Sequence, residues 1–442
     1  MALSSADESL IYHVLHSRFK RNQFRSNQLE IIRAVLEQKD VMVILSTGHG
    51  KSLTFQLPAA VEAQMNGGGF YVVVSPLLAL MKDQVQQLQN LGISADSINS
   101  TTTGKQRLEI MEDFAKGEGC LLYVSPEQCV SAGFGAFIAK CSEQGLVRRV
   151  VIDEAHCAVE WGSDFRKDYA RLGSDFRRFL KRPVPFMALT GTASPSMQDQ
   201  MNKVLQLRKA VKFTASMRRP HLHYEVRYVE DPTDRLRDLL KFLKMYRGRI
   251  ACLHDGPIYP GCGIVYCRSR ASTEVIASEI NRELGQCAAA YHAGLSVGER
   301  NDVLAKWIAG DPMYSIVIAT IAFGLGIDKP DTRFVIHFNL PNNIEAYAQQ
   351  TGRGGRDRKA ARCILYFSAE EAQKCVGFAK LDGEKQSAQA LIKFATTISC
   401  CRHDALGTYF GDAGEGFCQF ACDYCKTPQR LYQRYEQWQA DL

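Results

Sequence analysis

The chain has 442 residues, a length that predicts about two to four domains. Hydrophobic residues make up 46% of it and charged residues 23%, which is typical of an ordinary soluble globular protein. The formal net charge of +7 is compatible with a polyanionic partner but is too small to indicate nucleic acid by itself.

Two features of the sequence lead us to expect neither export nor membrane insertion. The first residues, MALSSADESLIYHVLHSRF, lack a basic start followed by an apolar core, so we expect no secretory signal. No apolar run approaches the roughly 20 residues that span a bilayer, so we expect no membrane partner. The 15 cysteines then favour reduced thiols and a metal site over a disulfide framework, in the cytosol or the nucleus.

Short apolar strands alternate with helical stretches in two rounds. Residues 6–40 predict helices on either side of a polar turn, QFRSNQ. The alternation runs from 41 to about 205 and again from about 220 to 367, which is the pattern of a doubly wound parallel sheet. Residues 254–263 predict a loop, and the pattern after 369 is helical and rich in cysteine. The predicted strands are 41–45, 71–75, 120–125, 149–154, 186–191, 263–268, 288–292, 315–320, 333–338 and 363–368.

The segment VMVILSTGHGKSLTFQLPAA, residues 41–60, predicts a buried strand, a Gly-rich turn and the start of a helix. Gly48 and Gly50 let the backbone curl so that several N–H groups point at one anion. Lys51 adds a movable positive charge, and Ser52 has a hydroxyl suited to Mg²⁺. The strict phosphate-loop pattern begins with a glycine where this chain has Leu45. The predicted phosphate-binding residues are Thr47, Gly48, His49, Gly50, Lys51 and Ser52.

A pair of carboxylates follows the predicted strand 149–154, within VIDEAHC. Because the carboxyl ends of parallel strands meet at one edge of a sheet, Asp153 and Glu154 are expected to face the same crevice as the phosphate loop. Asp153 is then suited to hold Mg²⁺ through water, and Glu154 to orient and deprotonate an attacking water. The alternative is an acidic N-cap on the following helix, which a DEAH stretch downstream of TGxGKS disfavours.

The motifs of the first half resemble those of RecQ-type helicases, in the family's order and spacing: FRSNQ, STGHGKS, SPLLALMKDQV, VSPEQ, DEAHCAVEWGSDFRKDY and ALTGTAS. The resemblance implies a superfamily 2 motor that unwinds DNA with 3′→5′ polarity. It also implies that Gln28 reads the adenine edge and that Arg25 packs on the base. The chain departs from the family at Arg21, where an aromatic or apolar residue is common, at Ser46, usually Pro, and at Gly191, usually Ala.

The segment CAVEWGSDFRKDY, residues 157–169, resembles the aromatic-rich loop of this family, which senses single-stranded DNA and signals to the ATP site. The side chains agree with that role, because aromatic rings stack on bases and a guanidinium contacts phosphate. We therefore expect DNA contacts from Trp161, Phe165, Arg166 and Tyr169. The alternative, that these rings pack under a loop, is disfavoured by their position directly after the catalytic strand.

The second half continues the resemblance with GIVYCRSR, YHAGL, VIATIAFGLGIDKPDTRFVIH and YAQQTGRGGRD. Two arginines in its last motif suit a γ-phosphate, because guanidinium groups stabilise charge that spreads over phosphate oxygens in the transition state. A solvated surface pair is the alternative. The resemblance implies that Arg356 is the arginine finger and Arg353 its partner, and that Gly326 and Asp328 bind the nucleotide.

The same motif departs from the family at two positions. The family usually has Glu where this chain has Gln350, and Ala where it has Gly354. The resemblance further implies that ATP lies between Lys51 of one half and Arg356 of the other. Hydrolysis would then open and close a cleft and drive stepping along a strand.

Four cysteines near the C-terminus have the spacing of a zinc site. The late CxxxCxxC places three thiolates on one tight turn, and four thiolates satisfy tetrahedral Zn²⁺. Cys400 competes with its neighbour for the fourth position, and the resemblance of CRHDALGTYFGD to the family favours Cys401. Because four protein ligands leave no open position, we expect a structural site. The predicted ligands are Cys401, Cys418, Cys422 and Cys425.

These features predict an α/β fold of two RecA-like parallel-sheet domains with a cleft between them, followed by a small helical zinc-binding subdomain. The expected domains are 1–205, 206–368 and 369–427, with a C-terminal helix at 428–442. The CxxxC spacing and the GCGIVYCR strand are most similar to the short RecQ subgroup that lacks a winged helix. The final helix carries Arg430, Arg434, Tyr435 and Trp438, which suit either DNA contact or docking against the core.

The resemblance implies an ATP-dependent DNA helicase that couples Mg-ATP hydrolysis to translocation on single-stranded DNA and to unwinding in repair and recombination. It implies ATP, Mg²⁺ and Zn²⁺ as cofactors, single-stranded and forked duplex DNA and repair or replication proteins as partners, and a monomer in the nucleus. One alternative is a DNA-dependent ATPase, translocase or strand-annealing protein with weak unwinding. Another is a catalytically idle scaffold, which the intact Lys51, Asp153, Glu154 and Arg356 disfavour. RNA as the substrate is disfavoured by the resemblance alone.

Overall fold

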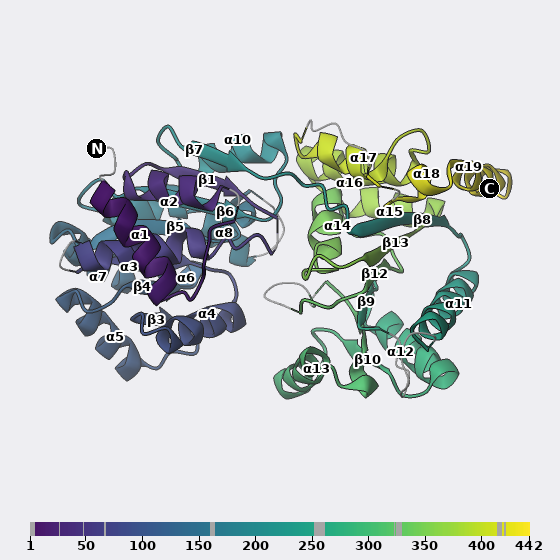
Figure 1. Cartoon of the computed structure of the whole chain (residues 1–442), viewed down its shortest axis with the longest axis horizontal. Helices are drawn as coiled ribbons and strands as arrows, with labels where there is room; N and C mark the ends of the chain where they lie inside the picture. Colours follow the sequence, from purple (N-terminus) through teal and green to yellow (C-terminus); the bar gives the residue numbers. More distant parts are fainter. Residues whose placement is uncertain are drawn as a thin grey trace. The chain divides into compact units, whose positions relative to one another are not determined.

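Figure 1 shows the computed structural model of the chain, which divides into two compact units, Met1–Ala215 and Ser216–Leu442. The structure describes residues 5–25, 27–46, 48–65, 68–159, 164–251, 261–321, 323, 329–412, 418–419 and 421–442. Among these residues, no helix is both long enough and apolar enough to cross a membrane.

The described part of the first unit contains a 7-stranded sheet in the order β3-β4-β2-β5-β6-β1-β7, and every neighbouring pair in it is parallel. Most of its strands are buried on both faces, because continuous apolar runs suit a sheet that helices cover on each side. The strands are β1 (Val41–Ile44), β2 (Phe70–Val74), β3 (Ala95–Ile98), β4 (Leu121–Val124), β5 (Val147–Ile152), β6 (Phe186–Thr190) and β7 (Val211–Thr214).

Two hydrophobic clusters lie on opposite faces of this sheet, and β1 contributes to both. Met42 and Ile44 belong to one cluster, whereas Val41 and Val43 belong to the other, as the two-residue period of a strand requires. Complete burial of each such side chain contributes about 1.5–3 kcal/mol. The helices of this unit are α1 (Ser5–Ser17), α2 (Gln28–Leu36), α3 (Leu53–Met65), α4 (Leu78–Asn90), α5 (Gly104–Lys116), α6 (Pro126–Cys129), α7 (Ala132–Glu143), η1 (Ala155–Ala158), α8 (Asp164–Ala170), η2 (Leu172–Phe176), α9 (Arg177–Phe179) and α10 (Pro195–Val204).

The described part of the second unit contains a 6-stranded parallel sheet in the order β10-β11-β9-β12-β13-β8. Its strands are β8 (Leu222–Tyr228), β9 (Gly263–Tyr266), β10 (Ala288–Tyr291), β11 (Ile316–Ala319), β12 (Phe334–His337) and β13 (Ala361–Phe367). Its helices are α11 (Pro232–Ala251), α12 (Arg270–Leu284), α13 (Val297–Ala309), η3 (Pro312–Tyr314), α14 (Ile344–Thr351), α15 (Ala369–Phe378), α16 (Asp382–Thr396), α17 (Arg402–Tyr409), α18 (Asp423–Lys426) and α19 (Pro428–Ala440).

The predicted α/β fold with two parallel sheets is confirmed, and each predicted strand matches an observed one within a few residues. Three further strands, β3, β7 and β8, were not predicted. The sequence of β8, LHYEVRY, mixes charged and apolar residues because it lies at one edge of its sheet. The predicted loop at 254–263 lies mostly outside the described residues.

The first unit extends past the boundary expected at residue 205. Strand β7 pairs in register with β1, from Val41 opposite Val211 to Ile44 opposite Thr214. These residues therefore belong to the first sheet, and the compact unit ends at Ala215. The division into functional domains stays a prediction.

The cysteine-rich helices share one hydrophobic core with β8 and β13. Arg402 at the start of α17 donates to Asp423 through two guanidinium nitrogens, at 2.9 and 3.2 Å. The carboxylate of Asp423 also accepts the backbone N–H of Val226 on β8, at 2.9 Å. A buried ion pair with satisfied hydrogen bonds therefore fixes these helices to the edge of the second sheet.

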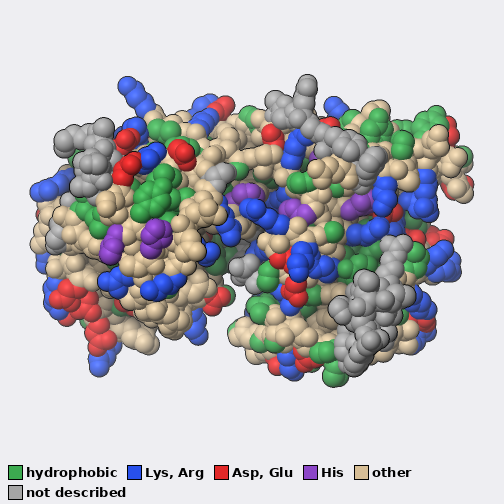
Figure 2. All heavy atoms as spheres, viewed as in Figure 1, with side chains coloured by type: hydrophobic (Ala, Val, Ile, Leu, Met, Phe, Trp, Pro, Cys, Tyr) green, Lys and Arg blue, Asp and Glu red, His purple; other side chains and the backbone are tan. Residues whose placement is uncertain are grey.

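Helix α19 docks on the second unit, which is one of the two arrangements expected for it. The indole N–H of Trp438 donates to Glu230 at 2.6 Å, and its ring packs against Tyr228 and Phe367. Arg434 donates to Glu225 at 3.2 Å. Figure 2 shows Lys and Arg side chains spread over both units on the face in view.

Candidate nucleotide and zinc sites

The phosphate loop connects β1 to α3 at the carboxyl edge of the first sheet. Gly48 and Gly50 have φ values of 87° and 76°, a conformation that side chains rarely adopt. The ammonium group of Lys51 donates to the backbone carbonyl of Leu45 at 3.0 Å. The loop thus leads into the N-terminus of a 13-residue helix, where backbone N–H groups and the helix dipole favour an anion.

The polar turn before α2 contacts this loop directly. Arg25 donates from its guanidinium to the Gly48 carbonyl at 2.6 Å, and its backbone N–H donates to the Gln28 side chain at 2.8 Å. The amide nitrogen of Gln28 donates to the Gly50 carbonyl at 3.0 Å. A Cβ atom at Gly50 would lie 2.5 Å from that nitrogen, so a side chain at position 50 would displace the Gln28 amide as well as strain the backbone at its positive φ. Recognition of adenine by Gln28 and Arg25 stays a prediction.

Asp153 and Glu154 follow β5, and β6 lies between β5 and β1 in the sheet. Asp153 is 8% exposed, and one of its oxygens accepts the backbone N–H of Glu154 at 3.0 Å. Burial, with the adjacent Glu154 carboxylate, raises the pKa of Asp153 to about 7, while Lys51 acts in the opposite direction. The structure therefore brings the predicted lysine and the first predicted carboxylate into electrostatic contact.

A chain of polar contacts links Glu154 to the end of β6, and its first step, between Glu154 and His156, is an ion-pair distance rather than a hydrogen bond. The Glu154 carboxylate lies 3.2 Å from His156, whose Nδ1 lies 2.9 Å from the Thr190 hydroxyl. That hydroxyl donates to the carbonyl of Thr192 at 3.0 Å. The motif ALTGTAS contains both threonines, but the sequence alone predicted no role for them. The polar residues at the end of this apolar strand, and directly after it, could have indicated that the threonines lie at the site.

A second polar chain runs behind Ser52. Gln84 on α4 donates to the Ser52 hydroxyl at 3.4 Å, and Gln56 on α3 donates to Gln84 at 3.5 Å and to the Tyr123 hydroxyl at 3.1 Å. These residues orient the hydroxyl that is expected to face Mg²⁺. Sequence reasoning missed Gln56 and Gln84, because glutamine is common on exposed helix faces and their burial shows only in the fold.

The aromatic-rich segment is described from Asp164 onward, as α8, and Trp161 lies outside the described residues. Phe165 and Arg166 lie in this helix, and their side chains are also outside the described part. Tyr169 is fully buried in the core of the first unit, and its hydroxyl donates to the backbone carbonyl of Asp153 at 2.9 Å. Its ring therefore offers no surface to a base, and its hydroxyl joins α8 to the end of β5. Signalling from this segment to an ATP site stays a prediction.

The predicted arginines lie on a Gly-rich turn after α14 in the second unit. The backbone N–H of Arg353 donates to Gln350, and the N–H of Gly355 donates to Thr332 at 2.8 Å. Arg353 is 5% exposed, whereas Arg356 is partly exposed. A Cβ at Gly352 would overlap the buried Arg219 guanidinium, so a side chain at this position would have to displace that group. Gly326 and Asp328 lie outside the described residues.

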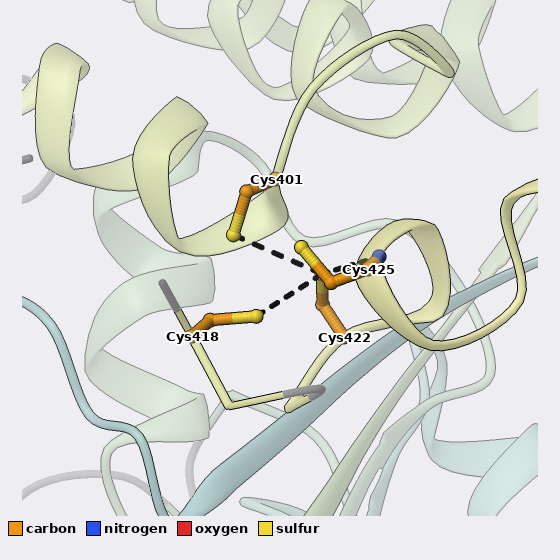
Figure 3. Close-up of side chains that lie close together, drawn as sticks. All are labelled: Cys401, Cys418, Cys422 and Cys425. Atoms are coloured by element: carbon orange, nitrogen blue, oxygen red, sulfur yellow. Dashed lines mark hydrogen bonds between the residues drawn. The ribbon is translucent and has the colours of Figure 1, made fainter. Parts of the chain in front are cut away.

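The predicted zinc ligands lie together in the second unit. Figure 3 shows the sulfur atoms of all four cysteines directed toward one another from three segments of chain. Sγ of Cys422 lies 3.7 Å from that of Cys418 and 3.8 Å from that of Cys401, and all four lie within 4.8 Å of one another. A tetrahedral zinc ion with Zn–S bonds near 2.3 Å needs sulfur separations of about 3.8 Å, so the cluster fits this metal.

The local backbone supports thiolate at this site. Cys401 and Cys422 precede the first turns of α17 and α18, where backbone N–H groups are available. A hydrogen bond from Cys422, together with the N–H groups of Asp404 and His403, lowers the pKa of Cys401 to about 5. The hydrogen bond with Cys401 raises the pKa of Cys422, and burial raises the pKa of Cys425, so the cluster without metal favours one thiolate, at Cys401, among neighbouring thiols. Cys400, the competing candidate, is not part of the cluster.

Three family models match successive parts of the chain. They are described as DEAD/DEAH box helicase, over residues 25–201, helicase conserved C-terminal domain, over 249–358, and RecQ zinc-binding, over 364–426. The third match includes all four clustered cysteines, in the order expected after two helicase domains. The chain belongs to the RecQ family of superfamily 2 helicases.

Curated RecQ proteins match almost the whole chain. ATP-dependent DNA helicase hus2/rqh1 of Schizosaccharomyces pombe is 37% identical over 93% of the chain, and helicase Q5 of Rattus norvegicus is 37% identical over 92%. ATP-dependent DNA helicase Q1 of Rattus norvegicus is 35% identical over 94%. The chain spans only 30%, 42% and 64% of the length of these three relatives, respectively.

Solved helicase structures share the fold of this RecQ chain. Saccharomyces cerevisiae Dbp5 bound to RNA and ADP BeF3 matches 98% of both chains with a TM-score of 0.62 and 14% identity. Mycobacterium smegmatis helicase Lhr bound to ssDNA and AMP-PNP matches 89% of this chain and 50% of its own, with a TM-score of 0.60 and 18% identity. These matches identify two RecA-like parallel-sheet domains.

Proposed function

We propose that the protein is an ATP-dependent DNA helicase. The observation that carries this proposal is the arrangement at the carboxyl edge of the first sheet, where Lys51 and Asp153 interact across β6 in a RecQ chain. The named relatives are ATP-dependent DNA helicases, which supports DNA as the substrate and the coupling of ATP hydrolysis to unwinding.

Each predicted residue has a role in this proposal. Lys51 and the loop N–H groups bind the phosphates of ATP, and Glu154 orients and deprotonates the attacking water. Ser52 and Asp153 would hold Mg²⁺, which neutralises charge on the phosphates. Arg356 acts as the arginine finger with Arg353 beside it, since paired guanidinium groups stabilise the charge of the transition state. The remaining nucleotide-binding residues are Arg25, Gln28, Thr47, Gly48, His49, Gly50, Gly326 and Asp328.

A steady-state ATPase assay tests the proposal. We expect hydrolysis that rises at least tenfold when single-stranded DNA is added, and little stimulation by single-stranded RNA of the same sequence. A strand-displacement assay on duplexes with a 3′ or a 5′ overhang then measures polarity, and we expect unwinding from the 3′ overhang alone. ATPase without displacement would favour the alternative function, a translocase or annealing protein. Absence of ATPase activity would favour the remaining alternative, a nucleic-acid-binding scaffold.

The aromatic-rich segment is proposed to carry the signal from DNA to this ATP site. The hydrogen bond between Tyr169 and the Asp153 carbonyl supports this role, because it joins the segment to the catalytic strand. We expect Trp161→Ala to keep the basal ATPase rate and to lose stimulation by DNA. A variant that keeps full stimulation would contradict the role. Tyr432→Ala, at an exposed aromatic residue of α19, is the matched control and should behave as the wild-type chain does.

We further propose a monomer that acts in the nucleus with DNA repair or replication proteins. The names of the relatives, which are DNA helicases from eukaryotes, support the compartment. Light scattering after size exclusion, with and without forked DNA, measures the oligomeric state. A stable dimer that unwinds faster than the monomer would contradict this part of the proposal.

A further inference from the structure

The imidazole of His337 lies beneath the arginine turn of the second unit, at the carboxyl end of β12. It is fully buried, and its Nε2 lies 2.8 Å from the side-chain oxygen of Gln350. Because an amide oxygen only accepts, Nε2 carries the hydrogen and donates it. Burial lowers the pKa of His337 to about 4, so the ring is neutral at physiological pH. A neutral hydrogen bond therefore joins β12 to α14.

Gln350 connects this histidine to the turn. It lies in the last turn of α14 and is 7% exposed. Its side chain contacts β12, and its backbone carbonyl accepts the N–H of Arg353 at 3.1 Å. One residue thus holds the end of the helix against the sheet and starts the turn that carries the arginines. A rotation of α14 would move both contacts together.

Tyr266 completes the support from β9. Its ring stacks on His337 with centroids 5.3 Å apart and an interplanar angle of 20°. Its hydroxyl donates to the carbonyl of Phe323 at 2.8 Å and also hydrogen-bonds to the Arg353 side chain. Tyr266 therefore contacts the arginine turn, the histidine and the segment after β11 at once.

We propose that Gln350 is a positioning residue that, through His337 and Tyr266, fixes the turn carrying Arg353 and Arg356. The inference rests on the proposed ATPase function of that turn. It predicts that removing the amide displaces the arginines and slows the chemical step, while ATP binding at the phosphate loop of the first unit is kept. Small displacements of a positioned catalytic group cost up to about 100-fold in rate.

The surroundings of His337 explain why an amide suits this place. Tyr266 faces it from β9, Tyr347 faces it from α14 at 5.1 Å, and β13 presents the apolar Leu365. Arg353 lies on the far side of Tyr266, at its hydroxyl. A carboxylate at position 350 would favour protonation of His337 and would place an ion pair in an apolar layer. The geometry of the turn would then depend on pH.

The test compares Gln350→Met, which keeps the length and loses the hydrogen bond, with Gln350→Glu, which keeps an acceptor. Gln373→Met, at an exposed position of α15, is the control. We measure kcat and KM of DNA-stimulated ATPase from pH 6 to pH 8.5. We expect Gln350→Met to lower kcat about tenfold with KM within about twofold, because the interaction acts in the transition state. Gln350→Glu should recover most of kcat, and its ratio to the wild-type kcat should change with pH.

Three results would overturn the inference. The first is an unchanged kcat in Gln350→Met, and the second is equal loss in both variants, which indicates a role of size alone. The third comes from a measurement that does not depend on ATPase activity, the ¹⁵N NMR resonances of the histidine ring. We expect neutral His337 in the wild-type chain at pH 6, a protonated ring in Gln350→Glu and a shifted Nε2 in Gln350→Met. Identical His337 signals in all three proteins contradict the hydrogen bond, whereas absence of ATPase in the wild-type chain contradicts the proposed function.

Discussion

The hydroxyl of Tyr169 donates a hydrogen bond of 2.9 Å to the backbone carbonyl of Asp153. Both residues are buried, so Tyr169→Phe leaves that carbonyl without this donor. We expect the first unit to lose about 1–2 kcal/mol of unfolding free energy, measured by urea denaturation. Tyr347→Phe is the control, because the buried Tyr347 hydroxyl has no hydrogen-bond partner among the described residues. Equal losses in the two variants would show that the Tyr169 bond contributes nothing.

Removing Lys51 tests the phosphate loop. Lys51→Ala takes away the cation that interacts with Asp153 and that is proposed to bind the phosphates. We expect ATPase and unwinding to fall by about 100-fold or more, since such cations act where charge develops. Lys105→Ala removes a lysine that is 87% exposed on α5 and should leave both rates unchanged. Retention of ATPase in Lys51→Ala would refute the site.

Arg356 is expected to affect the chemical step rather than binding. For Arg356→Ala we expect kcat to fall about 1,000-fold or more, as for other arginine fingers, with a much smaller change in the Kd of ATP. Fluorescent nucleotide titration and single-turnover hydrolysis separate the two quantities. Lys359→Ala removes an exposed cation a few residues later and is the control. A variant that weakens nucleotide binding and leaves the single-turnover rate intact would speak against the finger.

Two adjacent cysteines allow a sharp test of the zinc site. Cys401→Ser removes a member of the sulfur cluster, whereas Cys400→Ser removes the neighbouring thiol outside it. We expect the first variant to lose zinc and several kcal/mol of stability, because binding of a structural metal contributes to folding. Cys400→Ser should keep both its zinc and its stability. Zinc released by thiol modification and the midpoint of thermal unfolding measure the outcome, and the reverse result would assign the ligand to Cys400.

The stability of the second unit should depend on pH through His337. Its pKa is about 4 when folded and about 6.5 in an unfolded chain, so below 6.5 the unfolded state binds a proton that the folded state does not. Stability is therefore fully present above about 6.5 and falls as pH decreases toward 4, by up to about 1.4 kcal/mol per pH unit. Other buried histidines also contribute to the slope of unfolding free energy against pH. The measured quantity is therefore the difference in slope between the wild-type chain and His337→Phe. His337→Phe should flatten the slope, and an identical slope would show that His337 does not titrate in this way.

The parts of the fold that the sequence predicted are those fixed by local pattern. Continuous apolar runs identified the buried strands, and the glycines of the phosphate loop indicated a turn that the φ values at Gly48 and Gly50 confirm. Three of the four edge strands, β3, β7 and β8, were missed, because a strand with one open edge tolerates the charged residues that β8 contains. The spacing of the cysteines likewise predicted a cluster that the structure shows.

The contacts that the sequence could not predict join residues far apart in the chain. Nothing in the local sequence places Gln28 against Gly50, or Arg402 against Asp423. Tyr169 was expected at a surface because it belongs to an aromatic-rich segment, yet the helical period of α8 turns it into the core. Motifs thus identified which residues take part, and only the fold showed which of them touch.

The pairing of β7 with β1 decides how the first unit can be isolated. β7 covers the hydrogen-bonding edge of the strand that leads into the phosphate loop. A recombinant fragment that stops at residue 205 would leave that edge open as a template for intermolecular strand addition. Such a fragment should associate through β1 and bind nucleotide poorly, whereas a fragment that continues through Ala215 should stay monodisperse.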